Sequence, residues 1–180
     1  MTKKILFILL VLSLRAWSAP IQWTSGVGGN DHWYDFITYS STWDQAYIHV
    51  QSQSFMGQQG YLTTITSVTE NNFIQANFSA YHGYWIGAYQ TNKLAEPGGN
   101  WAWVTGEAWS YSNWASGEPN DANGDEDHAH FYSAGTWNDM HNGSASNGYF
   151  VEYNVPIPEI SSLMLISLGI FCLAYFKINR

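Results

Sequence analysis

Glu118-Pro-Asn-Asp-Ala-Asn-Gly-Asp-Glu-Asp127 is the most distinctive segment of this chain, and Trp137-Asn-Asp139 follows it a short distance downstream. The first segment carries five carboxylates: Glu118, Asp121, Asp125, Glu126 and Asp127. No Lys or Arg lies between Lys93 and Lys177. Carboxylates at close range repel and raise one another's pKa, so this crowding requires a counter-charge. Ca²⁺ accepts about six to eight oxygen ligands, and the sequence therefore predicts a calcium site on a loop.

Length and composition indicate one aromatic-rich domain flanked by targeting segments. The chain has 180 residues, including ten Trp, twelve Tyr and nine Phe, and few charged residues. Between Ala19 and Glu159 all 14 acidic residues occur against a single base, Lys93. Nucleic acid binding needs basic patches, so this balance argues against a nucleic acid partner. The only cysteine, Cys172, lies in an apolar run near the C-terminus, which leaves the globular part without disulfides.

Residues 1–18 have the layout of a secretory signal peptide. Lys3 and Lys4 precede an apolar run over residues 5–14, and small residues follow. Cleavage after Ser18 would place Ala16 and Ser18 at the two small-residue positions. An uncleaved membrane anchor is the alternative, although the apolar run is short for that role.

The C-terminal segment, residues 155–180, has the order of a sorting signal. Val155-Pro-Ile-Pro-Glu159 leads into an apolar run over residues 160–176, which would span roughly 26 Å as a helix, and basic residues close the chain. This order resembles the bacterial PEP-CTERM signal, which implies transient membrane insertion, processing by an exosortase-type enzyme and release to the cell surface or matrix. The motif departs from a strict Pro-Glu-Pro, and its basic end is thin. A plain transmembrane anchor remains the alternative.

Two helices are expected early in the central domain. Each would begin at a capping box, Thr42-Trp-Asp-Gln45 for the first and Ser67-Val-Thr-Glu70 for the second. Apolar residues follow on one face of each helix, at Trp43, Ala46, Tyr47 and Val50 and at Phe73, Ile74 and Phe78. We expect Gly57 and Gly60 to end the first helix.

Strands are expected mostly after the helices. Short apolar runs predict them at residues 61–65, 84–88, 101–104, 129–132 and 149–153. Residues 89–100 are rich in Gly, Pro and Asn and are expected to loop outward. Two early helices and several later strands predict an α+β domain over residues 19–154.

Several separated motifs resemble those of C-type lectin domains in order and spacing. They are Gly60-Tyr-Leu-Thr-Thr-Ile-Thr-Ser67, Trp85-Ile-Gly87, Asn113-Trp114, Gly117-Glu-Pro-Asn120 and Trp137-Asn-Asp139. The resemblance covers nearly all of residues 30–154. It implies a C-type lectin-like fold, with two helices, small antiparallel sheets and a long irregular loop region that holds calcium.

The resemblance also implies a site. It assigns five calcium ligands: Glu118, Asn120, Glu126, Asn138 and Asp139. It assigns four of them to carbohydrate as well: Glu118, Asn120, Glu126 and Asn138. Sugar hydroxyls would complete the metal shell. The Glu-Pro-Asn triplet resembles the selector for mannose- and glucose-type sugars, whereas Gln-Pro-Asp would suggest galactose. In the family the Glu-Pro bond is cis.

A second calcium is an open alternative in the same loop. Asp121, Glu126 and Asp127 could share in holding it, with the remaining ligands from the segment after Trp85, where Glu96 is the only acid. Zinc is a weaker interpretation of His128, His130 and His141, because the sequence fixes no cysteine or third ligand; core or surface histidines are favoured.

The cysteine pattern departs from the family. Most such domains carry two disulfides, and Val50 and Val151 stand at the positions of one pair, where apolar packing could replace the bridge. His128 and Asn142 stand at the positions of the other pair, where they would hydrogen-bond or face water.

These features predict a secreted or surface bacterial lectin that binds surface or matrix polysaccharide through calcium. The alternative is a structural or adhesion module that calcium orders, with protein or matrix rather than a monosaccharide as its partner. Catalysis is not expected, because a glycosidase needs two carboxyl groups in different environments across a cleft, and clustering on one loop suits metal ligation better.

Overall fold

The computed structural model describes residues 19–78 and 83–156. The predicted signal peptide lies outside the described residues, and so does the predicted C-terminal segment apart from Val155 and Pro156. Within the described ranges, no helix combines the length and apolar character that a bilayer crossing requires.

The elements alternate short strands with helices along the chain. The helices are α1 (Trp43–Val50) and α2 (Val68–Phe78). The strands are β1 (Ile21–Gln22), β2 (Trp33–Ser41), β3 (Ser54–Phe55), β4 (Gln58–Gln59), β5 (Tyr61–Leu62), β6 (Tyr84–Gln90), β7 (Trp101–Trp103), β8 (His128–Phe131), β9 (Trp137–Met140) and β10 (Ser146–Tyr153). Short 3-10 helices lie at Ser25–Val27, Lys93–Ala95, Ala122–Gly124 and Ser133–Gly135.

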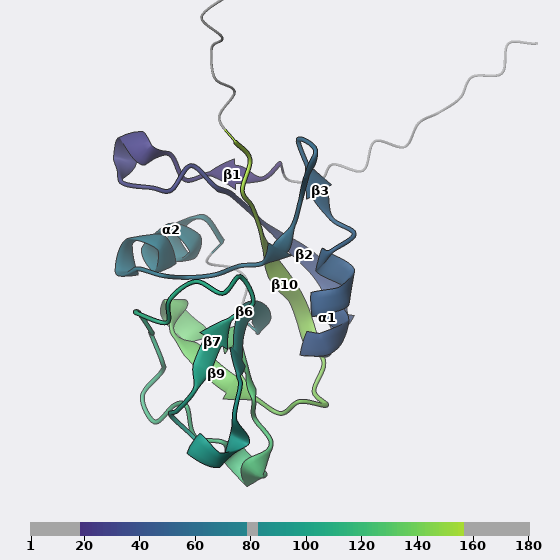
Figure 1. Cartoon of the computed structure of the whole chain (residues 1–180), viewed down its shortest axis with the longest axis vertical. Helices are drawn as coiled ribbons and strands as arrows, with labels where there is room; N and C mark the ends of the chain where they lie inside the picture. The colour runs from purple at the N-terminus through teal and green to yellow at the C-terminus, as the bar shows by residue number, and fades with distance from the viewer. Residues whose placement is uncertain (1–18, 79–82, 157–180) are drawn as a thin grey trace, which may run out of the picture.

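The last described strand runs through the middle of the main sheet. The strand order is β1-β2-β10-β6-β8-β9, with β5 also paired to β10 and β7 to β6. The β10–β6 pair is parallel, whereas the other pairs of this sheet are antiparallel. Figure 1 shows β10 in green beside β2 in blue, flanked by α1 and α2 on opposite sides. The expected α+β architecture, with two helices and a mostly antiparallel sheet, is confirmed.

Aromatic side chains fill two cores. One contains Ile74 and Phe78 of α2 with Trp103, Phe131 and Trp137 from the sheet. The other packs α1 against β5, β6 and β10, through Trp43, Val50, Leu62, Trp85 and Val151. Burial of such large apolar side chains is the main favourable term for a domain that lacks disulfides.

Helix α1 begins as predicted but ends earlier. The Thr42 hydroxyl accepts from the Gln45 amide at 3.4 Å, and the Gln45 side chain accepts from the Thr42 amide at 3.1 Å, which completes the capping box. The prediction that Gly57 and Gly60 end this helix is wrong. Ser52 donates its amide and its hydroxyl to the His49 carbonyl, at 3.0 and 2.7 Å, and turns the chain into the β3–β4 hairpin.

Helix α2 keeps half of its predicted capping box. The Ser67 hydroxyl accepts from the Glu70 amide at 3.2 Å, but the Glu70 carboxylate binds Thr66 instead of returning to Ser67. Ile74 and Phe78 are buried as expected, and Phe73 packs half-buried against the same core.

The predicted strands are present with shifted limits. The strand expected at residues 61–65 shortens to β5, because the Thr64 amide bonds to the Glu152 side chain. The segment expected to loop outward, residues 89–100, instead begins with the end of β6 at Gln90. Strands β1, β2, β3, β4 and β9 were not predicted.

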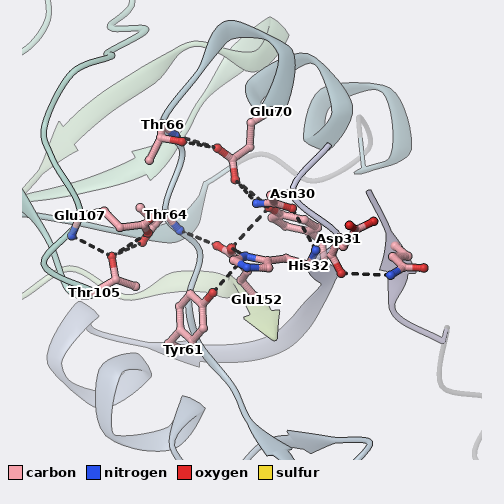
Figure 2. Close-up of polar contacts among 12 residues, drawn as sticks. Asn30, Asp31, His32, Tyr61, Thr64, Thr66, Glu70, Thr105, Glu107 and Glu152 are labelled. Carbon is pink, nitrogen blue, oxygen red and sulfur yellow. Dashed lines mark hydrogen bonds and ion pairs between the residues drawn. The ribbon is translucent and has the colours of Figure 1, made fainter. Parts of the chain in front are cut away.

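A buried polar cluster ties the start of the domain to its end (Figure 2). Glu152 of β10 is 1% exposed; its Oε1 contacts His32 Nδ1 at 2.5 Å and its Oε2 accepts from the Thr64 amide at 3.0 Å. Glu70 of α2 accepts from the Tyr34 hydroxyl at 2.6 Å. Buried carboxylates of this kind are tolerated because each oxygen has donors.

Without calcium, the free energy of unfolding should fall as pH rises from about 6 to about 8. Burial and the charge of Glu152 raise the pKa of Glu70 to about 7 from 4.5. The hydrogen bond to Glu152 raises the pKa of His32, so its stabilising proton is also lost as pH rises through that raised value. Both groups hold protons more tightly in the folded state. Glu70 alone should contribute a loss of about 1.4 kcal/mol over this interval.

Urea unfolding in EDTA at both pH values measures this dependence. Glu70→Gln removes one of the titrating groups and should flatten the dependence by roughly that amount. An equally steep change in the variant would mean that Glu70 does not titrate within this interval.

Candidate functional site

The fold joins the acidic loop to β9 through one buried carboxylate. Asp139 is fully buried, and its oxygens accept from the Asn120 amide at 3.1 and 3.0 Å and from the Asp121 amide at 2.8 Å. Asn138 and Asp139 stand on β9, whose register with β8 pairs Asn138 with His130. The two sequence segments that were expected to form one site therefore lie together.

Glu118 contributes a buried acceptor that lacks a donor. The Glu118-Pro119 bond is cis, and Glu118 Oε2 is inaccessible without a hydrogen-bond partner in the described residues. Burial, followed by the neighbouring carboxyl groups of Asp139 and Glu126, raises the pKa of Glu118 to about 7. A cation in contact with this oxygen would remove both penalties. The unpartnered oxygen therefore fits a metal ion with oxygen ligands.

Glu126 and Asp121 fold the loop back on itself. Glu126 Oε2 accepts from the Ala122 amide at 2.9 Å, and Asp121 Oδ1 accepts from the Glu126 amide at 3.1 Å. Burial raises the pKa of Glu126. These carboxylates, which could bind a metal, thus already accept hydrogen bonds from backbone amides. Within residues 19–78 and 83–156, no three His, Cys, Asp or Glu side chains are grouped so that they could hold a metal ion.

Asn138 is oriented by a buried histidine. Its Nδ2 lies 3.0 Å from His130 Nε2 and also contacts the Asp139 carbonyl. Burial lowers the pKa of His130 to about 4, so the ring is neutral and can accept this hydrogen bond. Sequence reasoning did not assign His130 to the site. The strand pairing that places it opposite Asn138 was not visible before β9 was known.

A lysine occupies the second acidic cluster. The Lys93 ammonium contacts Asp127 Oδ2 and lies 4.0 Å from Asp125 Oδ1. Burial opposes ionisation of Asp127, but Lys93 and Asn142 outweigh it and lower the pKa of Asp127. The role of Lys93 was missed, although its position as the single base among 14 acids was a usable signal.

The segment after Trp85 also supplies unpartnered oxygens. Three side-chain oxygens are inaccessible to solvent there: both carboxylate oxygens of Glu96 and Oε1 of Gln90. None of them has a hydrogen-bond partner among the described residues. Burial raises the pKa of Glu96, and the charges of Asp121, Asp127 and Asp139 raise it further. Glu96 therefore lies in the electrostatic range of the acidic loop, and its part in a second calcium site stays a prediction.

Comparison with known proteins agrees with this geometry. Residues 40–150 match the family model described as "Lectin C-type domain". The chain belongs to the C-type lectin domain family.

Relatives of this C-type lectin domain come from distant organisms. The chain is 35% identical over 137 residues to halomucin of Haloquadratum walsbyi. The aligned region covers 68% of this chain and 1% of halomucin. It is 33% identical over 120 residues to C-type lectin domain family 4 member G of Mus musculus, covering 66% of this chain and 38% of that protein. The chain thus spans less than half of these relatives.

Solved C-type lectins share the fold. The carbohydrate-recognition domain of cow CD23, solved in the presence of GlcNAc2Man3 oligosaccharide, superposes with a TM-score of 0.62 at 27% identity, covering 77% of this chain and 95% of that chain. The lectin CEL-I from Cucumaria echinata gives 0.58 at 25% identity, covering 70% and 92%. C-type lectins typically bind Ca²⁺, and the family is non-enzymatic in general.

The residues expected at disulfide positions of this C-type lectin domain make other contacts. Val50 and Val151 are both buried in the core beneath α1. His128 Nδ1 and Asn142 Oδ1 are 2.8 Å apart, so this pair hydrogen-bonds rather than facing water. His128 also stacks on Trp43, with ring centroids 4.3 Å apart. The remaining histidine of the trio, His141, pairs with Asp125 at 3.0 Å.

Proposed function

We propose that this domain binds carbohydrate through a calcium ion. The ligands are the side chains of Glu118, Asn120, Glu126, Asn138 and Asp139. The observation that carries the proposal is the buried, partnerless oxygen of Glu118, which lies beside two further carboxyl groups in a loop that Asp139 fastens to β9. A bound calcium ion would supply the missing positive charge and would leave coordination positions for hydroxyl groups of a ligand.

The same side chains select the sugar. An ionised Glu118 accepts a hydrogen bond and the Asn120 side-chain amide donates one, whereas the Asn138 amide must exchange its bond to His130 or to the Asp139 carbonyl before it donates to a sugar. This arrangement of acceptor and donor suits adjacent equatorial hydroxyls, as in mannose and glucose, and we propose that sugar class. The likeness to the cow CD23 domain, solved with a mannose-containing oligosaccharide, supports it.

Calorimetry tests the proposal in two steps. Calcium is titrated into metal-free protein, and methyl α-mannoside is then titrated into the calcium-loaded and EDTA-treated forms. Heat from the sugar only in the calcium-loaded form is the expected result. Calcium binding without any competition by monosaccharides would favour the alternative of an adhesion module that binds protein or matrix. Absence of calcium binding at millimolar concentration would overturn the assignment.

C-type lectins are commonly extracellular or cell-surface proteins, which agrees with the composition of both ends. We propose secretion through residues 1–18 and surface sorting through residues 155–180, with an exosortase-type enzyme as the processing partner and transient membrane attachment before cleavage. The support is the order of basic, apolar and Pro-rich segments in the sequence.

A second calcium near Asp121, Glu126 and Asp127 is a separate proposal. Lys93 would compete with this ion for Asp127. Because the Lys93 ammonium already contacts Asp127, a second divalent ion must displace it. We expect Lys93→Gln to strengthen the weaker calcium-binding step severalfold, because the variant removes a competing positive charge. Calcium titration of both proteins at one ionic strength measures this effect.

Lys93→Arg is the matched control, because it keeps the charge and should leave the weaker step unchanged. Equal calcium stoichiometry and affinities in wild type, Lys93→Gln and Lys93→Arg would show that no second ion enters this cluster.

A further inference from the structure

A cavity of about 480 Å³ lies away from the acidic loop. Its walls come from α1, the β4 strand, β5 and the turn after β7, and include Tyr47, Gln51, Gln59, Tyr61, Val104 and Thr105. None of the expected calcium ligands lines it. The volume falls within the range of small-molecule sites, which is about 300–1,000 Å³.

Tyr61 and Thr105 of the cavity wall are hydrogen-bonded to residues of the polar network in Figure 2. The Tyr61 hydroxyl lies 3.4 Å from His32 Nδ1, which in turn contacts the fully buried Glu152. The Thr105 hydroxyl lies 3.1 Å from Thr64 Oγ1 and donates to Glu107 at 2.9 Å. These bonds fix the wall before any ligand arrives, which reduces the entropic cost of binding.

The part of the cavity wall formed by α1 and β4 has an aromatic ring beside two side-chain amides that hydrogen bonds hold in place. Tyr47 is 40% exposed, and its ring stacks on Trp43 with centroids 5.4 Å apart and planes at 5°. Gln51 Nε2 donates to the Tyr47 carbonyl at 3.2 Å, and Gln59 Nε2 donates to the Gln51 carbonyl at 3.0 Å. Neither Oε1 of these glutamines accepts a hydrogen bond from a described residue. Two acceptors and the Tyr47 hydroxyl therefore remain for a ligand.

The chemistry of the lining indicates an uncharged ligand. Val50, Gly60 and Val104 provide an apolar part, and no charged side chain is among the lining residues. A charged ligand would find no counter-charge there, whereas the surrounding domain is strongly acidic. A molecule with one apolar face and a rim of hydroxyl groups matches the ring, the apolar part and the free amide oxygens.

We propose that this cavity is a second saccharide-binding site, for a neutral sugar unit of a glycan, and that it works without calcium. The inference goes beyond the proposed function and does not depend on it, because the two sets of residues do not overlap. Two sites on one small domain would let a single polysaccharide chain, or two chains, be held at once.

Nuclear magnetic resonance of the whole protein in EDTA tests this proposal. Maltotriose, cellotriose and N-acetylchitotriose are titrated to millimolar concentration while the side-chain amide signals of Gln51 and Gln59 are followed. We expect at least one of them to shift these signals saturably, and Tyr47→Ala to weaken that binding by about tenfold or more.

Tyr39→Ala is the matched control, because Tyr39 is 37% exposed and does not line the cavity. It should bind as the wild type does. The proposal is overturned if none of the three sugars shifts the two amide signals, or if Tyr39→Ala and Tyr47→Ala weaken binding equally. Failure of mannoside binding in calcium with these shifts intact would count against the loop site alone.

Discussion

Replacing Asp139 by alanine is expected to abolish calcium binding, with an affinity loss of more than about 100-fold. The substitution removes an expected ligand and also frees the amides of Asn120 and Asp121, which the Asp139 carboxylate now holds. The loop would then lose these hydrogen bonds to β9, and partly buried amides left without acceptors carry their own cost. Saccharide binding in the loop should disappear together with the metal.

Asp125→Ala is the appropriate control for that experiment. It also removes one carboxylate from the loop, but Asp125 bonds to Asn142 and His141 and is outside the proposed ligand set. Calcium calorimetry on both variants, with circular dichroism to verify folding, separates ligation from general charge. If Asp125→Ala loses as much calcium affinity as Asp139→Ala, the loop attracts calcium through its net charge and the five-ligand site is wrong.

The double variant Glu118→Gln with Asn120→Asp is expected to reverse the sugar preference from mannose to galactose. The exchange swaps acceptor and donor on the two sides of Pro119 while conserving the net charge. A buried hydrogen-bonding group that meets the wrong partner costs about tenfold in affinity or more, so two such exchanges should move the mannose-to-galactose ratio by about 100-fold.

Competition by methyl α-mannoside and methyl α-galactoside at saturating calcium measures that ratio. Calcium affinity serves as the internal control. It should stay within severalfold of wild type, because the wild type and the double variant have the same number of carboxylates in the loop. An unaltered sugar ranking with calcium still bound would show that Glu118 and Asn120 do not select the ligand.

The features that local sequence could predict were those with a local cause. The capping box at Thr42 and Gln45 formed because its donors and acceptors are three residues apart. The loop acids Glu118 and Glu126 and the β9 residues Asn138 and Asp139 could be grouped because the family resemblance supplied their long-range contact. Charge crowding alone would have indicated only a solvated surface loop.

The features that escaped prediction depend on tertiary contacts. Strand β2 buries Tyr34 and Asp35 in succession, so it shows no clean alternation of apolar and polar residues. The early end of α1 follows from the turn at Ser52 rather than from a glycine. Lys93 reaches Asp127 across the loop, and His130 faces Asn138 only through the pairing of β8 with β9.

The placement of β10 has a consequence for biosynthesis. Residues 146–153 fill the slot between β2, near the start of the domain, and β6. Until a nascent chain has delivered them from the ribosome, both neighbouring strands expose unpaired edges that can capture other chains. We therefore expect the fold of this domain to be completed only after residue 153 has been synthesised, through pairings that are distant in sequence and so are slow to close.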